Sequence, residues 1–418
     1  CQEVKDFVPL AFRLSQASGL YAGYIMTTTL ADGGASVRLG PNHWPEQSMN
    51  NPGLIRTDTL DPENTVLLPP RTGKKEVGMP ERVERLLAEA EQAGVNVQVG
   101  PAGKAKVGFV TCGVAWQHLR AALSELGLAD KFPILKLGMT YPLSDRQVAE
   151  FAANVEYLVV VEERRGFLEQ QVAEVVGRVR QLNPGTRFGQ VWGKRFPSGH
   201  EGFPAVLGLH PSIVIEKLVK LFRLVDQPLA SRMAAKFEES LATIRQASSV
   251  RFAIPSRTPT FCPGCPHRDS SNVLLEICRQ FMDAKYMRRK HRCGPVDLVF
   301  HGDTGCYTML MFAPNERLMH NYSGMGLGGA TGAGIDPFIT NKQVVFMGDS
   351  TFFHSGQIAI SNSIKAGQDI TYIILDNRTT AMTGHQPTPG VEEDVLGNLT
   401  PRQDIEKIVR AVTAMGGA

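Results

Sequence analysis

The sequence predicts an α/β protein built from doubly wound parallel sheets with helices on both faces. From residue 106 onward, runs of Val, Ile, Leu and Phe typical of buried strands alternate with helical segments of about 10–15 residues. The same alternation returns after residue 255. Parallel strands need long crossover connections, usually helices, so this alternation favours parallel sheets over hairpins.

The chain is expected to contain more than one domain, because 418 residues are too many for one ordinary hydrophobic core. Five segments are expected: the truncated end of an amino-terminal domain (1–45), a surface-packed linker (46–104), a first α/β domain (105–222), a connector (223–254) and a second α/β domain, truncated at its end (255–418).

The first two segments hold few predicted elements. Apolar residues at helical spacing predict a helix over residues 7–14, and Gly19 follows as a stop signal. Residues 24–29 are predicted to form a strand. The linker begins with a Pro- and Asn-rich stretch and continues into a charged helix around residues 81–93.

The two α/β domains hold most of the predicted strands. Those of the first domain are expected at residues 107–111, 132–137 and 157–161, with helices at residues 115–126, 145–154 and 167–179. A Pro/Gly-rich stretch (183–210) and a polar helix (211–222) follow. Strands of the second domain are expected near residues 298–301, 344–347 and 372–375.

Composition describes a soluble, folded protein, with 43% hydrophobic and 20% charged residues. The net charge of +3 favours neither nucleic acid nor a membrane surface as a partner. No apolar run approaches the ~20 residues of a membrane span. Seven cysteines without a secretory signal argue against a disulfide framework, so a cytoplasmic location is expected. The basic run at residues 288–292 is interpreted as a solvated loop or, alternatively, as a docking site for an acidic electron carrier.

The strongest functional signal is a pair of strand ends in the second domain. One hydrophobic strand ends in Gly-Asp-Ser at residues 348–350, and another ends in Asp-Asn at residues 376–377. The 26 residues 351–376 separate Ser350 from Asn377, which is enough for one helix and the next parallel strand. Both polar ends are therefore expected at the carboxyl edge of the sheet, where open α/β folds bind ligands.

These residues suit a metal ion and a diphosphate. Asp349 and Asn377 offer the oxygen ligands that Mg²⁺ prefers, and the backbone carbonyl near Thr379 is a third candidate. Gly348 lets the backbone approach a diphosphate, which Ser350 is placed to hydrogen-bond at a helix amino terminus. The spacing is typical of thiamine-diphosphate sites. The alternative is two ordinary strand-to-helix turns in which Asp and Asn cap helices.

A dinucleotide site is the rival interpretation. Gly324, Gly326 and Gly329 fit the pattern G-x-G-x-x-G, and Asp349 follows 20 residues after Gly329. That fingerprint must follow a buried strand, however, and residues 318–322 make a poor one. We therefore expect a loop that opens a helix of small residues, which would pack tightly on the sheet or on the cofactor.

A second constellation is a C-x-x-C motif. Cys262 and Cys265 could hold zinc, an iron–sulfur cluster or a redox pair. No second C-x-x-C follows, but Cys306 lies in another turn at a strand end and is expected at the same sheet edge. The alternative is that these are small buried thiols.

Four motifs together resemble the 2-oxoacid:ferredoxin oxidoreductases. Phe-Cys-Pro-Gly-Cys-Pro-His (261–267) resembles the opening of that family's thiamine-binding domain, and Gly-Asp-Thr-Gly-Cys-Tyr-Thr (302–308) is similar to its second motif. Residues 348–356 and 375–386 resemble the alpha subunit of the indolepyruvate type. The first α/β domain resembles, more loosely, the family's transketolase-C-like domain, and residues 1–45 the end of its pyrimidine-binding domain.

The resemblance implies roles for individual residues. They are Asp349, Asn377 and the Thr379 carbonyl for Mg²⁺; Gly348, Ser350 and His267 for the diphosphate; and Gly324, Met325 and Gly326 for the aminopyrimidine or thiazolium ring. In some family members, cysteines matching Cys262, Cys265 and Cys306 hold a 4Fe-4S cluster. His354 is a candidate for proton transfer; the alternative is a packed structural histidine.

The implied activity is oxidative decarboxylation of a 2-oxoacid, aryl in the indolepyruvate type, to an acyl-coenzyme A. The implied partners are coenzyme A, ferredoxin and a smaller beta-type subunit. The family's activating glutamate falls outside this sequence, and residues 25–30 lack the family's arginine near the threonines. Two alternatives stay open: a non-oxidative thiamine-dependent decarboxylase, and an inactive scaffold subunit with the same fold.

Overall fold

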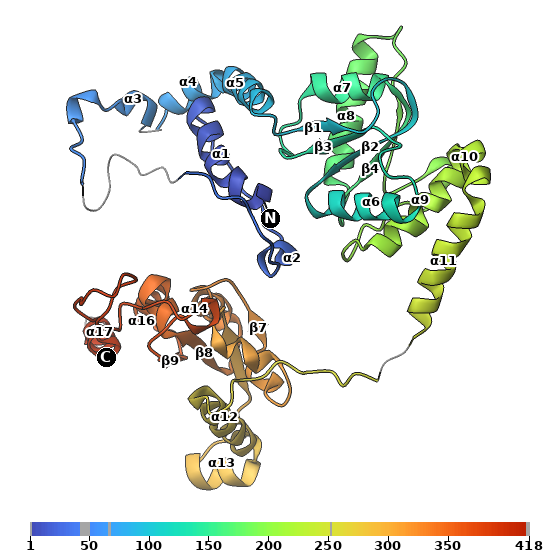
Figure 1. The fold of residues 1–418 in the computed structure, drawn as a ribbon. Helices are drawn as coiled ribbons and strands as arrows, with labels where there is room; N and C mark the ends of the chain where they lie inside the picture. Colours follow the sequence, from blue (N-terminus) through green and yellow to red (C-terminus); the bar gives the residue numbers. More distant parts are fainter. Residues whose placement is uncertain (1, 42–50, 66–67, 251–252, 415–418) are drawn as a thin grey trace. The chain divides into compact units, whose positions relative to one another are not determined.

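The structure is a computed structural model that describes residues 2–41, 51–65, 68–250 and 253–414. The chain divides into two compact units, Cys1–Phe252 and Ala253–Ala418 (Figure 1). The end of the predicted amino-terminal segment (42–45), parts of the predicted linker (46–50 and 66–67) and of the connector (251–252), and both chain ends (1 and 415–418) lie outside the described residues. No helix within the described ranges combines the length and apolar character needed to cross a bilayer.

The first unit contains a five-stranded sheet in the order β1-β3-β2-β4-β5. Its strands are β1 (Val97–Val99), β2 (Ala105–Cys112), β3 (Ile134–Leu137), β4 (Val155–Val161) and β5 (Gln190–Trp192). All pairs are parallel except β1 with β3. The three predicted strands are confirmed. The edge strands β1 and β5 were expected to be linker and Pro/Gly-rich loop, and each is only three residues long.

Helices cover both faces of this sheet (Figure 1). They are α6 (Gly113–Glu125), α7 (Asp145–Ala153), α8 (Phe167–Leu182) and α9 (Pro211–Val225). Alternate residues of β2 face opposite ways: Phe109 joins the apolar cluster under α6 and α9, while Val110 joins the cluster under α7 and α8. The unit therefore has two separate cores, one on each face of the sheet.

The helix predicted to be polar, α9, is instead one of the most buried in the unit. Its buried residues are Val214, Ile215, Leu218, Val219, Leu221, Phe222 and Val225. The predicted connector also folds against this core as α10 (Gln227–Arg232) and α11 (Ala234–Ser249). The fully buried Phe237 of α11 stacks on Phe222, with ring centroids 6.1 Å apart. The connector is thus a structural part of the first unit.

The amino-terminal segment packs on the helix predicted at residues 81–93. Helices α1 (Gln2–Ser18) and α5 (Met79–Gln92) form a small apolar cluster with Leu14, Ala90 and Val95 at its centre. The strand expected at residues 24–29 is absent; residues 20–27 have no regular structure and α2 (Thr28–Ala31) follows. No strand of the described part of the chain pairs with this segment, and a strand needs such a partner. Two further short helices are α3 (Pro62–Thr65) and α4 (Arg71–Val77).

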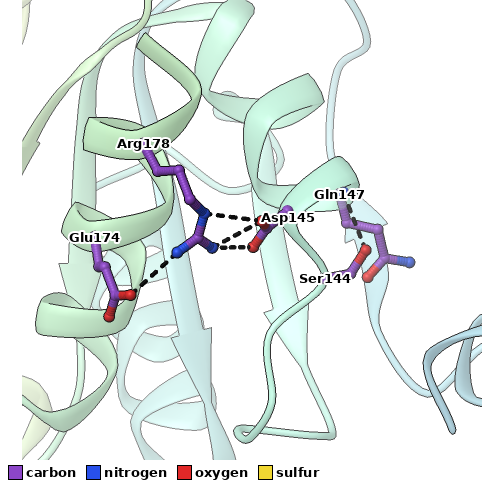
Figure 2. Close-up of polar contacts among 5 residues, drawn as sticks. All are labelled: Ser144, Asp145, Gln147, Glu174 and Arg178. Atoms are coloured by element: carbon purple, nitrogen blue, oxygen red, sulfur yellow. Dashed lines mark hydrogen bonds and ion pairs between the residues drawn. The ribbon is translucent and has the colours of Figure 1, made fainter. Parts of the chain in front are cut away.

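Polar contacts join α7 to α8 at the surface (Figure 2). The Ser144 hydroxyl accepts a hydrogen bond from the Gln147 backbone N–H at 3.3 Å and so caps α7. The next residue, Asp145, binds Arg178 of α8 through both carboxylate oxygens, with Nη2–Oδ1 at 2.6 Å and Nε–Oδ2 at 3.2 Å. Glu174 holds the other guanidinium nitrogen at 3.1 Å.

The second unit contains four parallel strands in the order β7-β6-β8-β9. The strands are β6 (Leu298–Gly302), β7 (Asn321–Tyr322), β8 (Lys342–Gly348) and β9 (Ile370–Leu375). Its helices are α12 (Pro266–Met282), α13 (Ala284–His291), α14 (Gly328–Ile335), α15 (Asp349–Thr351), α16 (Gln357–Ala366) and α17 (Ile405–Ala414), with a π-helical turn at Phe352–Gly356. Phe300 and Phe346 stack in the core below α12, while Met347 faces α16 and α17.

The basic run expected to be a solvated loop is mostly helical. Residues 288–291 form the last turn of α13, and Arg292 ends that helix in a left-handed conformation. The Asp283 carboxylate begins the helix by accepting backbone hydrogen bonds from Lys285 and Tyr286, and Met287 buries its inner face. The basic side chains are solvent-exposed, as expected.

Candidate functional site

The two polar strand ends lie side by side at the carboxyl edge of the second sheet. Strands β8 and β9 are parallel neighbours, and Gly348 pairs with Leu375. Asp349 therefore leaves β8 beside the point where Asp376 and Asn377 leave β9. Helix α16 and strand β9 fill the interval between them, as the spacing predicted.

Three oxygen-bearing groups converge there. With its amide turned so that the nitrogen faces both oxygens, Asn377 donates to the Thr379 carbonyl at 2.7 Å and to Asp349 Oδ1 at 3.2 Å. In the opposite orientation of the amide, the Asn377 Oδ1 would occupy this position and accept from the Thr379 N–H at 3.3 Å. The predicted trio of Asp349, Asn377 and the Thr379 carbonyl is thus within hydrogen-bonding distance around one point.

The Asp349 carboxylate is buried and only partly satisfied. It is 3% exposed, and its Oδ1 accepts from the Ser350 backbone N–H at 2.8 Å. Its Oδ2 is buried without a hydrogen-bond partner. Burial raises the pKa of this carboxyl, and the nearby charge of Asp376 raises it further. A buried carboxylate oxygen without a partner is destabilising unless a cation or a donor reaches it, so the residues fit a bound Mg²⁺ ion.

Side-chain ligands alone do not define this site. Among the described residues, no group of three or more His, Cys, Asp or Glu side chains is arranged to hold a metal ion. An ion at Asp349 would depend on amide and backbone carbonyl oxygens as well, which is the mixed ligand set that Mg²⁺ accepts when phosphate oxygens complete it.

A glycine loop lies against the turn that follows α15. Gly326 has φ +85°, and a Cβ atom there would collide with the Ser355 side chain. Its neighbours Gly324 and Met325 are exposed. Helix α14 then packs closely on α16 and on the sheet, because a Cβ on Gly329 would lie 2.6 Å from the Ala359 Cβ of α16 and 3.0 Å from the Tyr372 ring of β9. The predicted small-residue helix is confirmed, although Asn321 and Tyr322, within the segment judged a poor strand, form the short edge strand β7.

Sequence reasoning missed the two residues that hold this loop. Asp303 is fully buried, and its Oδ2 accepts from the backbone N–H groups of Gly326 at 3.0 Å and Gly328 at 3.4 Å. Its Oδ1 accepts a short hydrogen bond from the buried Tyr307 hydroxyl. The available signal was an Asp at the carboxyl end of a buried strand, the same signal that identified Asp349.

Cys306 lies next to the oxygen cluster, whereas the C-x-x-C motif forms a separate turn. The Cys306 Sγ lies 3.9 Å from the end of the Asn377 amide that points away from Asp349. The Cys265 N–H donates to the Cys262 carbonyl at 3.1 Å, and α12 begins directly after this turn. Burial raises the pKa of the Cys306 thiol, and the charges of Cys265 and Cys262 add to that rise. The three thiols therefore lie within electrostatic range of one another.

The two candidate histidines differ in exposure. His267 is buried in the first turn of α12, and its ring centroid lies 6.5 Å from that of Phe261. Burial lowers the pKa of His267 and so favours the neutral ring. His354 is exposed on the π-helical turn. The alternative that His354 is a packed structural residue is therefore wrong. Ser350 is buried in α15, two residues after Gly348.

Comparison with known families assigns both units. Residues 97–249 match the family described as "Indolepyruvate oxidoreductase domain", and residues 303–418 match "Thiamine pyrophosphate enzyme, C-terminal TPP binding domain". Among solved structures, a 2-oxoglutarate:ferredoxin oxidoreductase from Magnetococcus marinus is 18% identical over 40% of this chain and 54% of that chain. Its TM-score of 0.28 is too low to indicate a shared overall fold.

Curated relatives match almost the whole chain. "Indolepyruvate oxidoreductase subunit IorA" from Methanothermobacter thermautotrophicus is 31% identical over 98% of this chain, and the Archaeoglobus fulgidus protein of the same name is 29% identical over 98%. The chain spans about three fifths of these relatives, 59% and 58% of their lengths. From these matches, together with the strand order and the motif spacing, the chain belongs to the indolepyruvate oxidoreductase IorA family.

Proposed function

We propose that the second unit binds thiamine diphosphate and Mg²⁺, and that the protein catalyses oxidative decarboxylation of a 2-oxoacid. One observation carries this proposal. The buried Asp349 oxygen without a partner lies at the carboxyl edge of a parallel sheet, beside Asn377 and the Thr379 carbonyl. A cation there would be held by Asp349 and the Thr379 carbonyl, and by Asn377 once its amide presents the oxygen to the ion.

Each element of the site then has a task. Mg²⁺ would be held by Asp349, Asn377 and the Thr379 carbonyl. The diphosphate would be lined by Gly348, Ser350 and His267. The rings of the cofactor would lie beside Gly324, Met325 and Gly326. When bound, the cofactor supplies the electron sink for loss of CO₂, while the protein supplies position and electrostatics. The exposed His354 is a candidate for moving a proton at the mouth of the site.

The finer assignment concerns substrate and partners. We infer an aryl 2-oxoacid such as indolepyruvate, because the relatives are named for it. In this proposal the product is an acyl-coenzyme A and the electron acceptor is ferredoxin. The partner is a smaller beta-type subunit, and the location is cytoplasmic. Cys262, Cys265 and Cys306 are the candidate ligands of a 4Fe-4S cluster, and the effect of the first two thiols on the pKa of Cys306 supports that grouping. In the described residues the three thiols are not arranged as a metal site, so cluster binding would have to draw them together.

Titration calorimetry of thiamine diphosphate into the chain, with Mg²⁺ and then with EDTA, tests the cofactor assignment. We expect binding that requires Mg²⁺. Absence of binding by the folded chain would contradict the proposal and favour a scaffold subunit.

Anaerobic viologen reduction by the full-length protein with its partner subunit tests the reaction. A panel of aryl and alkyl 2-oxoacids, with and without coenzyme A, would rank the substrates. Reduction that depends on coenzyme A and thiamine diphosphate is the expected result. Release of CO₂ without reduction would instead indicate a non-oxidative decarboxylase.

A further inference from the structure

The buried carboxylate of Asp303 is not among the proposed ligands of the metal ion or of the cofactor. It lies at the carboxyl end of β6, one strand away from Asp349, and no solvent reaches it. Burial raises the pKa of the Asp303 carboxyl, and hydrogen bonds from Tyr307, Gly328 and Gly326 act against that rise. A buried carboxylate is costly unless its hydrogen bonds are satisfied, and here three donors satisfy it.

These three donors come from two different parts of the site. The Oδ2 atom accepts from Gly326 and Gly328, which are the turn of the glycine loop and the first residue of α14. Helix α14 has no side-chain cap at its own N-cap residue, Leu327. Asp303 therefore takes the place of that cap from a distant point of the sequence.

The Oδ1 atom accepts from Tyr307, and Tyr307 reaches the metal side of the site. A Cβ on Gly348 would lie 3.2 Å from the Tyr307 ring, so the ring packs directly against the residue before Asp349. The Tyr307 hydroxyl also interacts with Thr351, two residues after Asp349. The pair Asp303–Tyr307 thus connects the glycine loop with the Asp349 turn.

We propose that Asp303, held by Tyr307, is a positioning residue that fixes the glycine loop (324–328) against the Asp349 turn. This inference rests on the proposed function, in which that loop lies beside the cofactor rings. Asp303 itself touches no reacting atom. It acts through the backbone of Gly326, which has a positive φ and lies so close to Ser355 that no side chain fits between them.

Hydrogen exchange measured by mass spectrometry on the full chain tests the link to the loop. In Asp303→Asn, one carboxylate oxygen becomes an amide that cannot accept, so exchange of peptides covering residues 324–335 should rise about tenfold or more. Peptides of α12 should be unchanged. Tyr307→Phe, which removes only a hydroxyl, should raise exchange of the same loop by less. If Asp303→Asn does not fold, Tyr307→Phe carries the test alone.

Asp336→Asn is the matched control, because it makes the same acid-to-amide change beyond the other end of α14. Among the described residues, its Oδ1 accepts from the Gln343 side chain at 2.6 Å and from no N–H of the glycine loop, so loop exchange should stay at the wild-type rate. Unchanged loop exchange in both Asp303→Asn and Tyr307→Phe would overturn the inference.

Affinity separates positioning from a general structural role. Asp303→Asn should weaken thiamine diphosphate binding about tenfold and leave Mg²⁺-pyrophosphate binding within about twofold, because only the rings reach the glycine loop. Equal losses for both ligands would indicate a merely structural role and reject the positioning claim. A wild-type chain that binds neither ligand would contradict the proposed function, while the exchange comparison would still test the link between Asp303 and the loop.

Discussion

A Cβ atom on Gly326 would overlap the hydroxyl of Ser355 and lie 2.8 Å from its Cβ. Gly326 also has φ +85°, a conformation that side chains rarely adopt. The glycine loop and the π-helical turn after Asp349 are thus in direct contact through this one position. Any side chain there must move one of two segments that the proposed function places on the cofactor.

Gly326→Ala should therefore destabilise the second unit by about 1–3 kcal/mol and weaken thiamine diphosphate binding. Thermal unfolding and calorimetric titration would measure the two effects. Gly334→Ala is the matched control, because it lies in the nearby helix α14 and a Cβ atom there would meet no other atom within 4 Å. Alanine there should be neutral or stabilising by up to about 1 kcal/mol. Equal behaviour of the two variants would contradict this account of the loop.

The site residues that could be predicted from the sequence are polar residues that directly follow a buried strand. Asp349 and Asn377 follow buried strands, and parallel strands bring such ends together, so spacing alone located them. Asp303 satisfies the same rule but was missed, because two of its three hydrogen-bond partners are backbone N–H groups that leave no mark in a sequence. The hydrogen bonds of a buried carboxylate depend on the fold around it.

The fold was predictable where strands are long and buried. β1 and β5 were missed because each has only three residues and lies at a sheet edge, where few apolar side chains are required. Helix α11 shows the same kind of error: it has many polar residues and was taken as connector, yet its Phe237 ring is fully buried against Phe222. Leu241 and Ile244 follow Phe237 at helical spacing and pack on the same core, so this periodicity could have been read from the sequence.

Asp349→Asn should separate metal affinity from stability. Replacing a charged ligand with a neutral one should weaken Mg²⁺-dependent thiamine diphosphate binding by over a hundredfold, about 3–5 kcal/mol. The cofactor-free protein should not lose stability, because burial already disfavours the charged carboxylate. Titration calorimetry and urea unfolding would test the two statements. Asp376→Asn, a change at an exposed neighbour, should retain binding; equal loss in both variants would contradict the assignment of the metal ligand.

The same carboxylate predicts a pH dependence of stability without cofactor. The pKa of Asp349 is raised in the folded chain, so the folded state binds that proton more tightly than the unfolded state. Its favourable contribution is present below the unfolded pKa and is lost as pH rises through the folded pKa. Asp303, whose pKa is also raised, adds a second contribution of the same sign.

Unfolding of the wild type and of Asp349→Asn in EDTA, between about pH 4 and about pH 8, would measure this effect. The wild type should lose stability relative to the variant as pH rises, and the slope that remains in the variant should combine Asp303 with the other shifted groups, among them Glu162 and His301. Binding of Mg²⁺ and thiamine diphosphate should show the opposite trend, improving as pH rises, because the metal needs the ionised carboxylate. Parallel stability curves for the two proteins would contradict the burial of an ionisable Asp349.

The polar contacts around α7 and α8 predict that the helix cap contributes more to the stability of the first unit than the ion pair does (Figure 2). Ser144 caps α7 through the Gln147 N–H, and Ser144→Ala should destabilise the first unit by about 0.5–2 kcal/mol. Arg178 and Asp145 form a bidentate ion pair, but their side chains are 44% and 50% exposed, so Arg178→Gln should cost no more than about 1 kcal/mol.

Urea unfolding at low and at high salt separates the contribution of the cap from that of the ion pair, since salt screens only the ion pair. The cost of Ser144→Ala should be independent of salt, whereas that of Arg178→Gln should shrink as salt rises. A larger, salt-independent cost for Arg178→Gln would mean that its side chain stabilises the helix pair by packing rather than by charge.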